Sequence, residues 1–140
     1  MCTPLIVHWP DGLKTKPGSI TGQPGHVMDI MATCLEVTGS AYPQKYNGNI
    51  IEPLEGLSLL PVLIGKKYEG HKTLAWEHEG GRAFRSGDWK ISALRKGNWE
   101  LVDLKSDRTG TRNLAVENPE KLKELTNLWN SWADKMGIEY

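Results

Sequence analysis

The stretch TLAWEHEGGRAFRSGDWKISALRKGNWELVDL, residues 73–104, decides the fold of this chain. It contains four short runs with aromatic or β-branched residues, and tight-turn sequences at Gly80–Gly81, Gly87–Asp88 and 96–98 separate them. The expected strands are Thr73–His78, Arg82–Arg85, Trp89–Leu94 and Trp99–Leu104. Because turns this short join strands that pair with their neighbours in sequence, the stretch predicts a four-stranded antiparallel sheet.

A helix is predicted after the sheet. Asn118 suits the N-cap, and Pro119 suits the first helical position. One apolar stripe then recurs at helical spacing up to Gly137, and it consists of Leu122, Leu125, Leu128, Trp129, Trp132 and Met136. We expect this stripe to cover one face of the sheet, which gives an α+β lobe with most of the six tryptophans in its core. The competing interpretation is that exposed tryptophans stack on a sugar ring.

The first part of the chain predicts one strand and one helix. Pro4–Trp9 is a short apolar run that ends at a turn sequence, which is typical of a buried strand. Apolar residues recur at helical spacing over Val27–Val37, and Gly39 follows as a stop. This segment therefore predicts an amphipathic helix.

Between these elements and the sheet the pattern is weaker. Residues 40–56 carry turn residues with little periodicity and predict a long irregular connection. A short helical turn is expected over Leu59–Ile64, with Ser58 as its cap. We place the junction between two lobes near Gly70, so that residues 1–70 form one lobe and residues 71–140 the other.

Composition excludes several classes of protein. The chain has 140 residues, with 17 Lys plus Arg and 17 Asp plus Glu, so its formal net charge is zero. A neutral chain without blocks of like charge argues against a nucleic-acid partner. No apolar run approaches the roughly 20 residues that cross a bilayer, so no membrane span is expected. Cys2 and Cys34 are too few to form a disulfide framework or a zinc site, and we expect free thiols.

The polar candidates gather at the end of the first predicted strand. Glu77, His78 and Glu79 are consecutive, and Arg82 follows. The helical zinc-protease motif needs a second His where Arg82 stands, so that interpretation fails. We predict Glu77, His78, Glu79 and Arg82 as substrate-binding residues, and the alternative is a solvated strand end.

Cations on successive strands are a second candidate. They are Arg82, Arg85, Lys90 and Arg95. They could converge as an anion-binding patch. The alternative is an ordinary solvated sheet face.

The order of these segments resembles the C-terminal third of the sulfatases, especially the bacterial arylsulfatase type. The segments that carry the resemblance are Pro4–Pro10, His26–Thr33, Gly56–Leu63, Trp76–Lys90, Trp99–Asp107 and Asn113–Ala115. Gly81 departs from the family, which has Asn there, and this departure puts a ligand contact in doubt. The resemblance implies that residues 1–70 end the catalytic α/β domain and that residues 71–140 form the small C-terminal subdomain.

The resemblance also implies what this chain lacks. Sulfatases oxidise a Cys or Ser in a Cys/Ser-x-Pro-x-Arg motif to formylglycine, and they hold a calcium ion with Asp and Asn oxygens. All of these residues precede the segment that this chain resembles. Cys2-Thr3-Pro4-Leu5-Ile6 is a near match, but Ile6 stands where Arg is required. We therefore expect no catalytic residue and no metal ligand here.

The function implied is that of a sulfatase segment that contributes to the fold and to the substrate cleft and is inactive alone. The alternative is a free-standing binding or interaction protein derived from such a segment. Expected partners are a second copy in a homodimer or a separate catalytic segment, with a sulfated sugar or an aryl sulfate as ligand. No export signal is expected on this chain, although the intact family is commonly exported.

Overall fold

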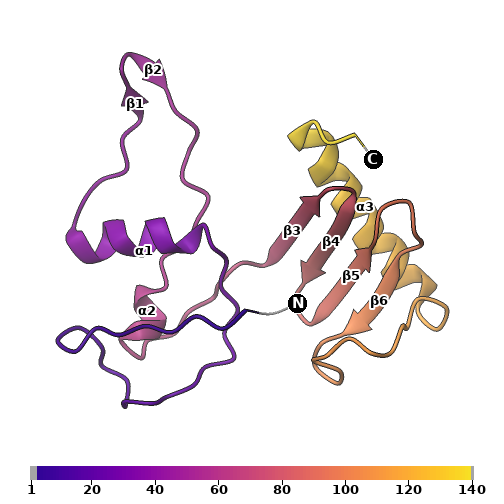
Figure 1. Ribbon diagram of the computed structural model, residues 1–140, viewed down its shortest axis with the longest axis horizontal. Coiled ribbons are helices and arrows are strands. Elements are labelled where there is room, and N and C mark those ends of the chain that lie inside the picture. Colours follow the sequence, from indigo (N-terminus) through magenta and orange to yellow (C-terminus); the bar gives the residue numbers. More distant parts are fainter. Residues whose placement is uncertain (1–2, 140) are drawn as a thin grey trace. The chain divides into compact units, whose positions relative to one another are not determined.

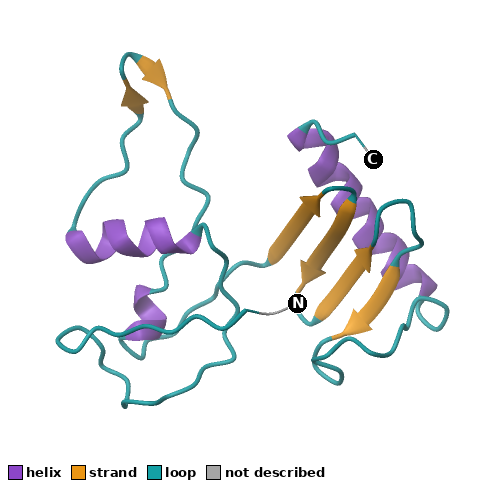
Figure 2. Ribbon diagram, in the orientation of Figure 1, coloured by secondary structure: helices purple, strands orange, loops and turns teal. Residues whose placement is uncertain are grey.

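The computed structural model describes residues 3–139. The described chain forms two compact units, one within residues 3–71 and the other within residues 72–139. Figures 1 and 2 show the elements of each unit. Among the described residues, no helix has the length and apolar character needed to cross a membrane.

The second unit is built on an antiparallel meander. Its strands are β3 (Thr73–His78), β4 (Gly81–Ser86), β5 (Trp89–Ala93) and β6 (Glu100–Asp103). They lie in the order β3-β4-β5-β6, and each pairs with the next strand along the chain. The row Ala75, Phe84, Ile91 and Leu101 is in register across all four strands. Alternation therefore places these four side chains on one face of the sheet.

Helix α3 (Pro119–Met136) covers this face (Figure 1). The core consists of Phe84, Ile91 and Leu101 from the sheet and Leu125, Trp129 and Ala133 from the helix. Trp89, Trp99 and Trp132 are partly buried and pack against it. The predicted α+β lobe is confirmed, and the indole of Trp129 is completely buried.

The ends of α3 follow the sequence with one exception. Asn118 occupies the N-cap position, but its side chain does not cap the helix. Its amide donates instead to the Leu114 carbonyl at 3.4 Å. Gly137 has φ 67°, a conformation that favours glycine, and this ends the helix.

The first unit contains two helices and a small hairpin. Helix α1 spans Asp29–Thr38, and helix α2 spans Leu60–Leu63. Between them, β1 (Lys45–Tyr46) and β2 (Asn49–Ile50) pair as a hairpin that projects from α1 in Figure 1. Asn47 and Gly48 have φ values of 48° and 84°. Residues 40–56 were expected to form a long irregular connection, and the structure adds one short hairpin within it, because Asn-Gly forms a tight hairpin turn.

The strand predicted at Pro4–Trp9 is also absent from the described residues. A strand exists only when its backbone pairs with another strand. Neither of the two sheets includes this segment. Leu5, Ile6 and Val7 lie exposed, so an apolar run alone did not produce a strand here.

Candidate functional site

The turn between β3 and β4 holds the residues predicted to bind substrate. Glu77 and Arg82 are cross-strand partners at the end of the two strands. The Glu77 carboxylate accepts a hydrogen bond from the Gly80 N–H at 2.8 Å. Glu79, which follows the strand, has φ 49°. Glu77 thus fastens a turn in which one non-glycine residue is held in the left-handed region.

Arg82 is engaged with the hydrophobic core. Its guanidinium carbon lies 4.7 Å from the ring centre of Trp99 and 5.8 Å from that of Trp129. Its Nη2 donates to the Gly97 carbonyl at 3.2 Å. Its buried Nε has no hydrogen-bond partner within the part of the chain that the structure describes. Arg82 therefore connects the β5–β6 loop to the aromatic core through cation–π contacts.

His78 and Glu79 remain open to solvent. Alternation along β3 places the His78 side chain on the face opposite to Glu77, away from α3. The β5–β6 loop lies alongside, because a Cβ on Gly80 would be 3.5 Å from the Cα of Arg95. The structure thus brings Glu77 and Arg82 together and leaves His78, Glu79 and Arg95 as exposed polar groups near this turn.

The four cations considered as one anion-binding patch do not lie on one face. Arg82 is on the face covered by α3, and Arg95 is in the β5–β6 loop. Arg85 and Lys90 are cross-strand partners on the other face. The Arg85 Nε donates to the Gly87 carbonyl at 2.8 Å. The interpretation of the four cations as one anion-binding patch is therefore wrong, because alternation along β4 places Arg82 and Arg85 on opposite faces of the sheet.

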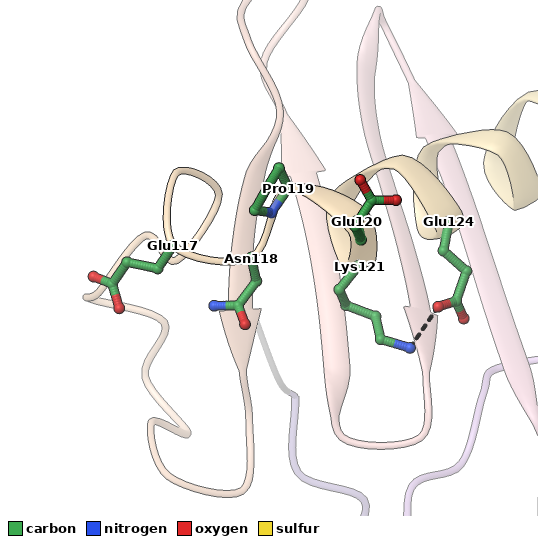
Figure 3. A pocket seen from close by; sticks show the side chains of 6 residues that line it. All are labelled: Glu117, Asn118, Pro119, Glu120, Lys121 and Glu124. Carbon is green, nitrogen blue, oxygen red and sulfur yellow. Dashed lines mark hydrogen bonds and ion pairs between the residues drawn. The ribbon is translucent and has the colours of Figure 1, made fainter.

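An open hollow of about 640 Å³ lies at the start of α3 (Figure 3). Its lining residues are Glu117, Asn118, Pro119, Glu120, Lys121 and Glu124. The single cation, Lys121, already pairs with Glu124 at 2.6 Å. Glu117 pairs with Arg112 at 2.9 Å, so the lining of this hollow offers a sulfate ester no unpaired cation.

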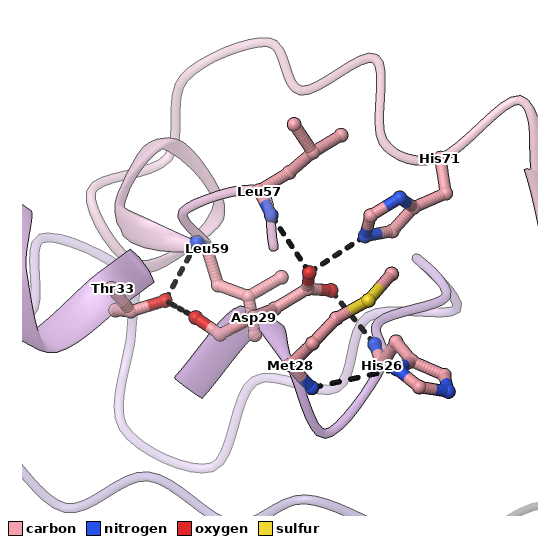
Figure 4. A network of polar contacts seen from close by, with 7 residues as sticks. All are labelled: His26, Met28, Asp29, Thr33, Leu57, Leu59 and His71. Atoms are coloured by element: carbon pink, nitrogen blue, oxygen red, sulfur yellow. Dashed lines mark hydrogen bonds and ion pairs between the residues drawn. The ribbon is translucent and has the colours of Figure 1, made fainter. Parts of the chain in front are cut away.

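A buried polar cluster surrounds Asp29 at the start of α1 (Figure 4). The Asp29 side chain is fully buried. Its Oδ2 accepts from the His26 N–H at 2.7 Å, and its Oδ1 accepts from the Leu57 N–H at 2.8 Å. The His71 Nε2 lies 2.6 Å from Oδ1. One carboxylate therefore ties together three segments that are distant in sequence.

A second polar side chain and a glycine complete this junction. The Thr33 hydroxyl donates to the Asp29 carbonyl at 2.6 Å and accepts from the Leu59 N–H at 2.9 Å. A Cβ on Gly56 would lie 2.1 Å from the Met28 carbonyl oxygen. Only glycine allows the backbone at this position to approach α1 so closely.

Burial alone would raise the pKa of Asp29, but the hydrogen bond with His71 and those from the Leu57 and His26 N–H groups outweigh it. The pKa of this carboxyl is therefore lowered. Burial and the nearby Asp29 charge raise the pKa of Tyr68. The Tyr68 hydroxyl is buried and has no hydrogen-bond partner among residues 3–139.

Sequence reasoning missed this junction. Asp29 is the first residue of α1 after the N-cap Met28, where an acid is common because it lies near the positive end of the helix dipole, and this position gave no indication that its carboxylate would accept from the His26 N–H. Nothing local indicated that Leu57 and His71 would meet the same carboxylate.

The described residues do not fit a metal centre. Within residues 3–139, no three side chains of His, Cys, Asp or Glu come close enough together to hold a metal ion. Cys34 is an exposed free thiol on α1. Cys2, which was judged a deceptive match to the formylglycine motif, lies outside the described residues.

Known proteins resemble the chain along nearly its full length, although no family model matches it. It is 30% identical over 142 residues to an uncharacterized sulfatase of Schizosaccharomyces pombe, covering 96% of this chain and 25% of that protein. It is 35% identical over 66 residues to an ulvan-active sulfatase of Formosa agariphila, covering 47% of this chain and 11% of that protein.

The fold comparison agrees. The chain superposes on the crystal structure of a candidate sulfatase from Bacteroides thetaiotaomicron with a TM-score of 0.59 and 27% sequence identity. This match covers 76% of the chain and 24% of the larger protein. The chain is therefore a homologue of the sulfatases by sequence and by structure, and it spans no more than about a quarter of their length.

Proposed function

We propose that this chain acts as a non-catalytic segment of a sulfatase, in which it supports the fold and lines part of the substrate cleft. The similarity of 96% of the chain to one quarter of a sulfatase is the observation that carries this proposal. The chemistry of the described residues agrees with it. Glu77 holds a turn, and Arg82 holds a loop against the aromatic core.

The contribution to the cleft is assigned to the turn between β3 and β4. His78 and Glu79 are exposed there, and Arg95 lies in the adjacent loop. An imidazole and a guanidinium can donate hydrogen bonds to a sulfate, and a carboxylate can accept from a sugar hydroxyl. A sulfated polysaccharide is the substrate class that we propose, and the name of the ulvan-active relative supports it.

Two measurements on the purified chain test this function. Sulfate release from aryl sulfates and from ulvan should not exceed the buffer rate. Amide shifts on titration with a sulfated disaccharide should be confined to residues 77–82 and 94–98. His78→Ala should abolish them, and Glu120→Gln, at the start of α3, should leave them unchanged. Turnover by the chain alone, or shifts confined to other residues, would refute the proposal.

A free-standing interaction protein is the second candidate, and the exposed apolar residues of α1 favour it. The two functions predict different results when the chain is added to a truncated sulfatase. A sulfatase segment should restore activity to a sulfatase that lacks the matching quarter, whereas an independent interaction protein should not.

A further inference from the structure

The face of the four-stranded sheet opposite to α3 is called the outer face below. Two neighbouring rows of cross-strand partners lie on it. One row consists of Leu74, Arg85, Lys90 and Val102, and the next consists of Trp76, Ala83, Ser92 and Glu100. His78 follows on the same face at the end of β3. Because side chains alternate between the two faces of a sheet, these residues form one continuous surface.

Arg85 and Lys90 form a pair of like charges at the middle of the first row. Like charges directly opposite each other on adjacent strands destabilise a sheet. The ion pairs among the described residues include neither side chain. The Arg85 Nε donates to the Gly87 carbonyl, which supplies no counter-charge. Glu100 is the one acid of the two rows, and it lies in the other row beside Ser92. The cation pair therefore fits an anionic ligand.

Apolar side chains enclose this cation pair at both ends of its row. Leu74 is 8% exposed and Val102 is 6% exposed. The loop after β6 folds over Val102, because a Cβ on Gly110 would lie 3.8 Å from both of its methyl carbons. Arg85 and Lys90 are themselves half-buried. An apolar surrounding lowers the local dielectric constant and so strengthens the attraction between the two cations and an anion.

Trp76 lies between the cation pair and the turn proposed to contact substrate. His78 is four residues beyond Leu74 on β3, and Leu74 is the cross-strand partner of Arg85. Four strand residues span about 13 Å. This distance is longer than one disaccharide unit. Trp76 lies midway on the same face, and an indole can stack on a sugar ring.

We infer that Arg85 and Lys90 form a second sulfate-binding site, and that a sulfated polysaccharide lies along the outer face from His78 across Trp76 to this pair. This inference rests on the proposed function and adds the requirement for a second sulfate. A guanidinium binds a sulfate through two parallel hydrogen bonds, and the ammonium adds a point charge.

The second site depends on the length of the ligand. Two cations at a surface hold a single sulfate weakly. A chain that is already bound at the turn raises the local concentration of its next sulfate, which makes the second contact favourable. A sulfated disaccharide therefore occupies the turn alone, and a tetrasaccharide reaches both sites.

Two tetrasaccharides that differ by one sulfate test this site. One carries a sulfate on each disaccharide unit, and the other carries a single sulfate. Calorimetric titration of the purified chain should show about 10- to 100-fold tighter binding of the disulfated compound, because hydrogen bonds between charged groups are strong. Only this compound should shift the amide signals of residues 85–92.

Two variants and a matched control locate the second sulfate. Lys90→Gln should reduce the affinity gain by at least ~5-fold, and Arg85→Gln with Lys90→Gln should abolish it. Lys90→Gln alone keeps the hydrogen bond between Arg85 and Gly87, so the β4–β5 turn stays intact. The control is Lys123→Gln, which removes the same charge from an exposed residue of α3 and should keep the full gain.

The results separate this site from the proposed function. Equal affinities of the two tetrasaccharides would overturn the second site, and so would a gain that Lys90→Gln leaves intact. Shifts at residues 85–92 with inorganic sulfate at the same concentration would assign the pair to a free anion instead. Shifts at residues 77–82 alone would overturn the second site and leave the proposed function intact. Shifts at residues 85–92 alone would refute the proposed contact at the turn and support Arg85 and Lys90 as a sulfate site.

Discussion

Removal of the Asp29 carboxylate should unfold α1 selectively. Asp29→Ala leaves the His26 N–H, the Leu57 N–H and the His71 ring without their acceptor. An orphaned buried donor costs about 1–3 kcal/mol, and water can reach some of these three groups, so the expected total is about 3–5 kcal/mol. This is a large fraction of the roughly 5–15 kcal/mol that stabilises a domain.

Hydrogen exchange followed by mass spectrometry measures this loss separately in each unit. Amides of residues 30–38 should exchange faster in Asp29→Ala by a factor that corresponds to ~3–5 kcal/mol, or to the full stability of the unit if that is smaller. Amides of β4 and β5 should not change and serve as an internal reference. Asp11→Ala is the matched control, since Asp11 is an exposed acid of the same unit. Unchanged exchange in α1 of Asp29→Ala would refute the assigned role.

Four further outcomes follow from the described contacts. Tyr68→Phe should raise the free energy of unfolding slightly or leave it within about 0.5 kcal/mol, because the buried hydroxyl has no partner in the described chain; a loss above about 1.5 kcal/mol in denaturant titration would contradict this. Gly56→Ala should speed hydrogen exchange of the α1 amides, because its Cβ would overlap the Met28 carbonyl. The control Gly22→Ala should leave the exchange rates unchanged, because a Cβ there would meet open space. Trp129→Ala should lower the free energy of unfolding in urea by about 3–5 kcal/mol, and Trp132→Ala should lower it less because Trp132 is only partly buried. Equal losses in the two variants would refute the placement of Trp129 at the centre of the core. The pKa of Asp29 is lowered on folding, so its stabilisation is present above the ordinary carboxyl pKa and should fade below about pH 4. The protection of α1 amides from hydrogen exchange should therefore depend less on pH in Asp29→Asn than in the unchanged chain.

The second unit was largely predictable from sequence because local signals and tertiary packing agree there. Thr73–His78 was predicted with the bounds that the structure has, and the other three strands were placed within one or two residues. Turn sequences fixed the register, and the α3 stripe then had a matching apolar face to cover. Trp76 lies outside the main aromatic cluster because alternation places it on the sheet face opposite to Ala75.

The first unit was less predictable because its contacts join distant segments. The helix at 27–37 was expected, but the role of Asp29 on its buried side was not. The pairing of Asp29 with Leu57 and His71 spans 28 and 42 residues and leaves no periodic signal. Pro4–Trp9 has the composition of a strand, and composition cannot supply the partner that a strand requires.

The sequence pattern predicted where in the fold the proposed binding residues lie, but not all of their contacts. Their position at a strand end was correct, since Glu77 and His78 end β3 and Glu79 lies in the turn. The engagement of Arg82 with Trp99 and Trp129 was not foreseen, because it depends on how the β5–β6 loop packs beside α3.

We propose that this chain completes a sulfatase and does not act alone. The most direct measurement titrates the chain into the Schizosaccharomyces pombe sulfatase from which the matching quarter has been deleted, and it follows hydrolysis of an aryl sulfate with the intact yeast protein as the positive control. We expect no turnover by either component alone and a rate that rises to a plateau at one equivalent of the chain. Turnover by the chain alone would contradict it, as would a flat titration under conditions in which the deleted yeast quarter restores activity.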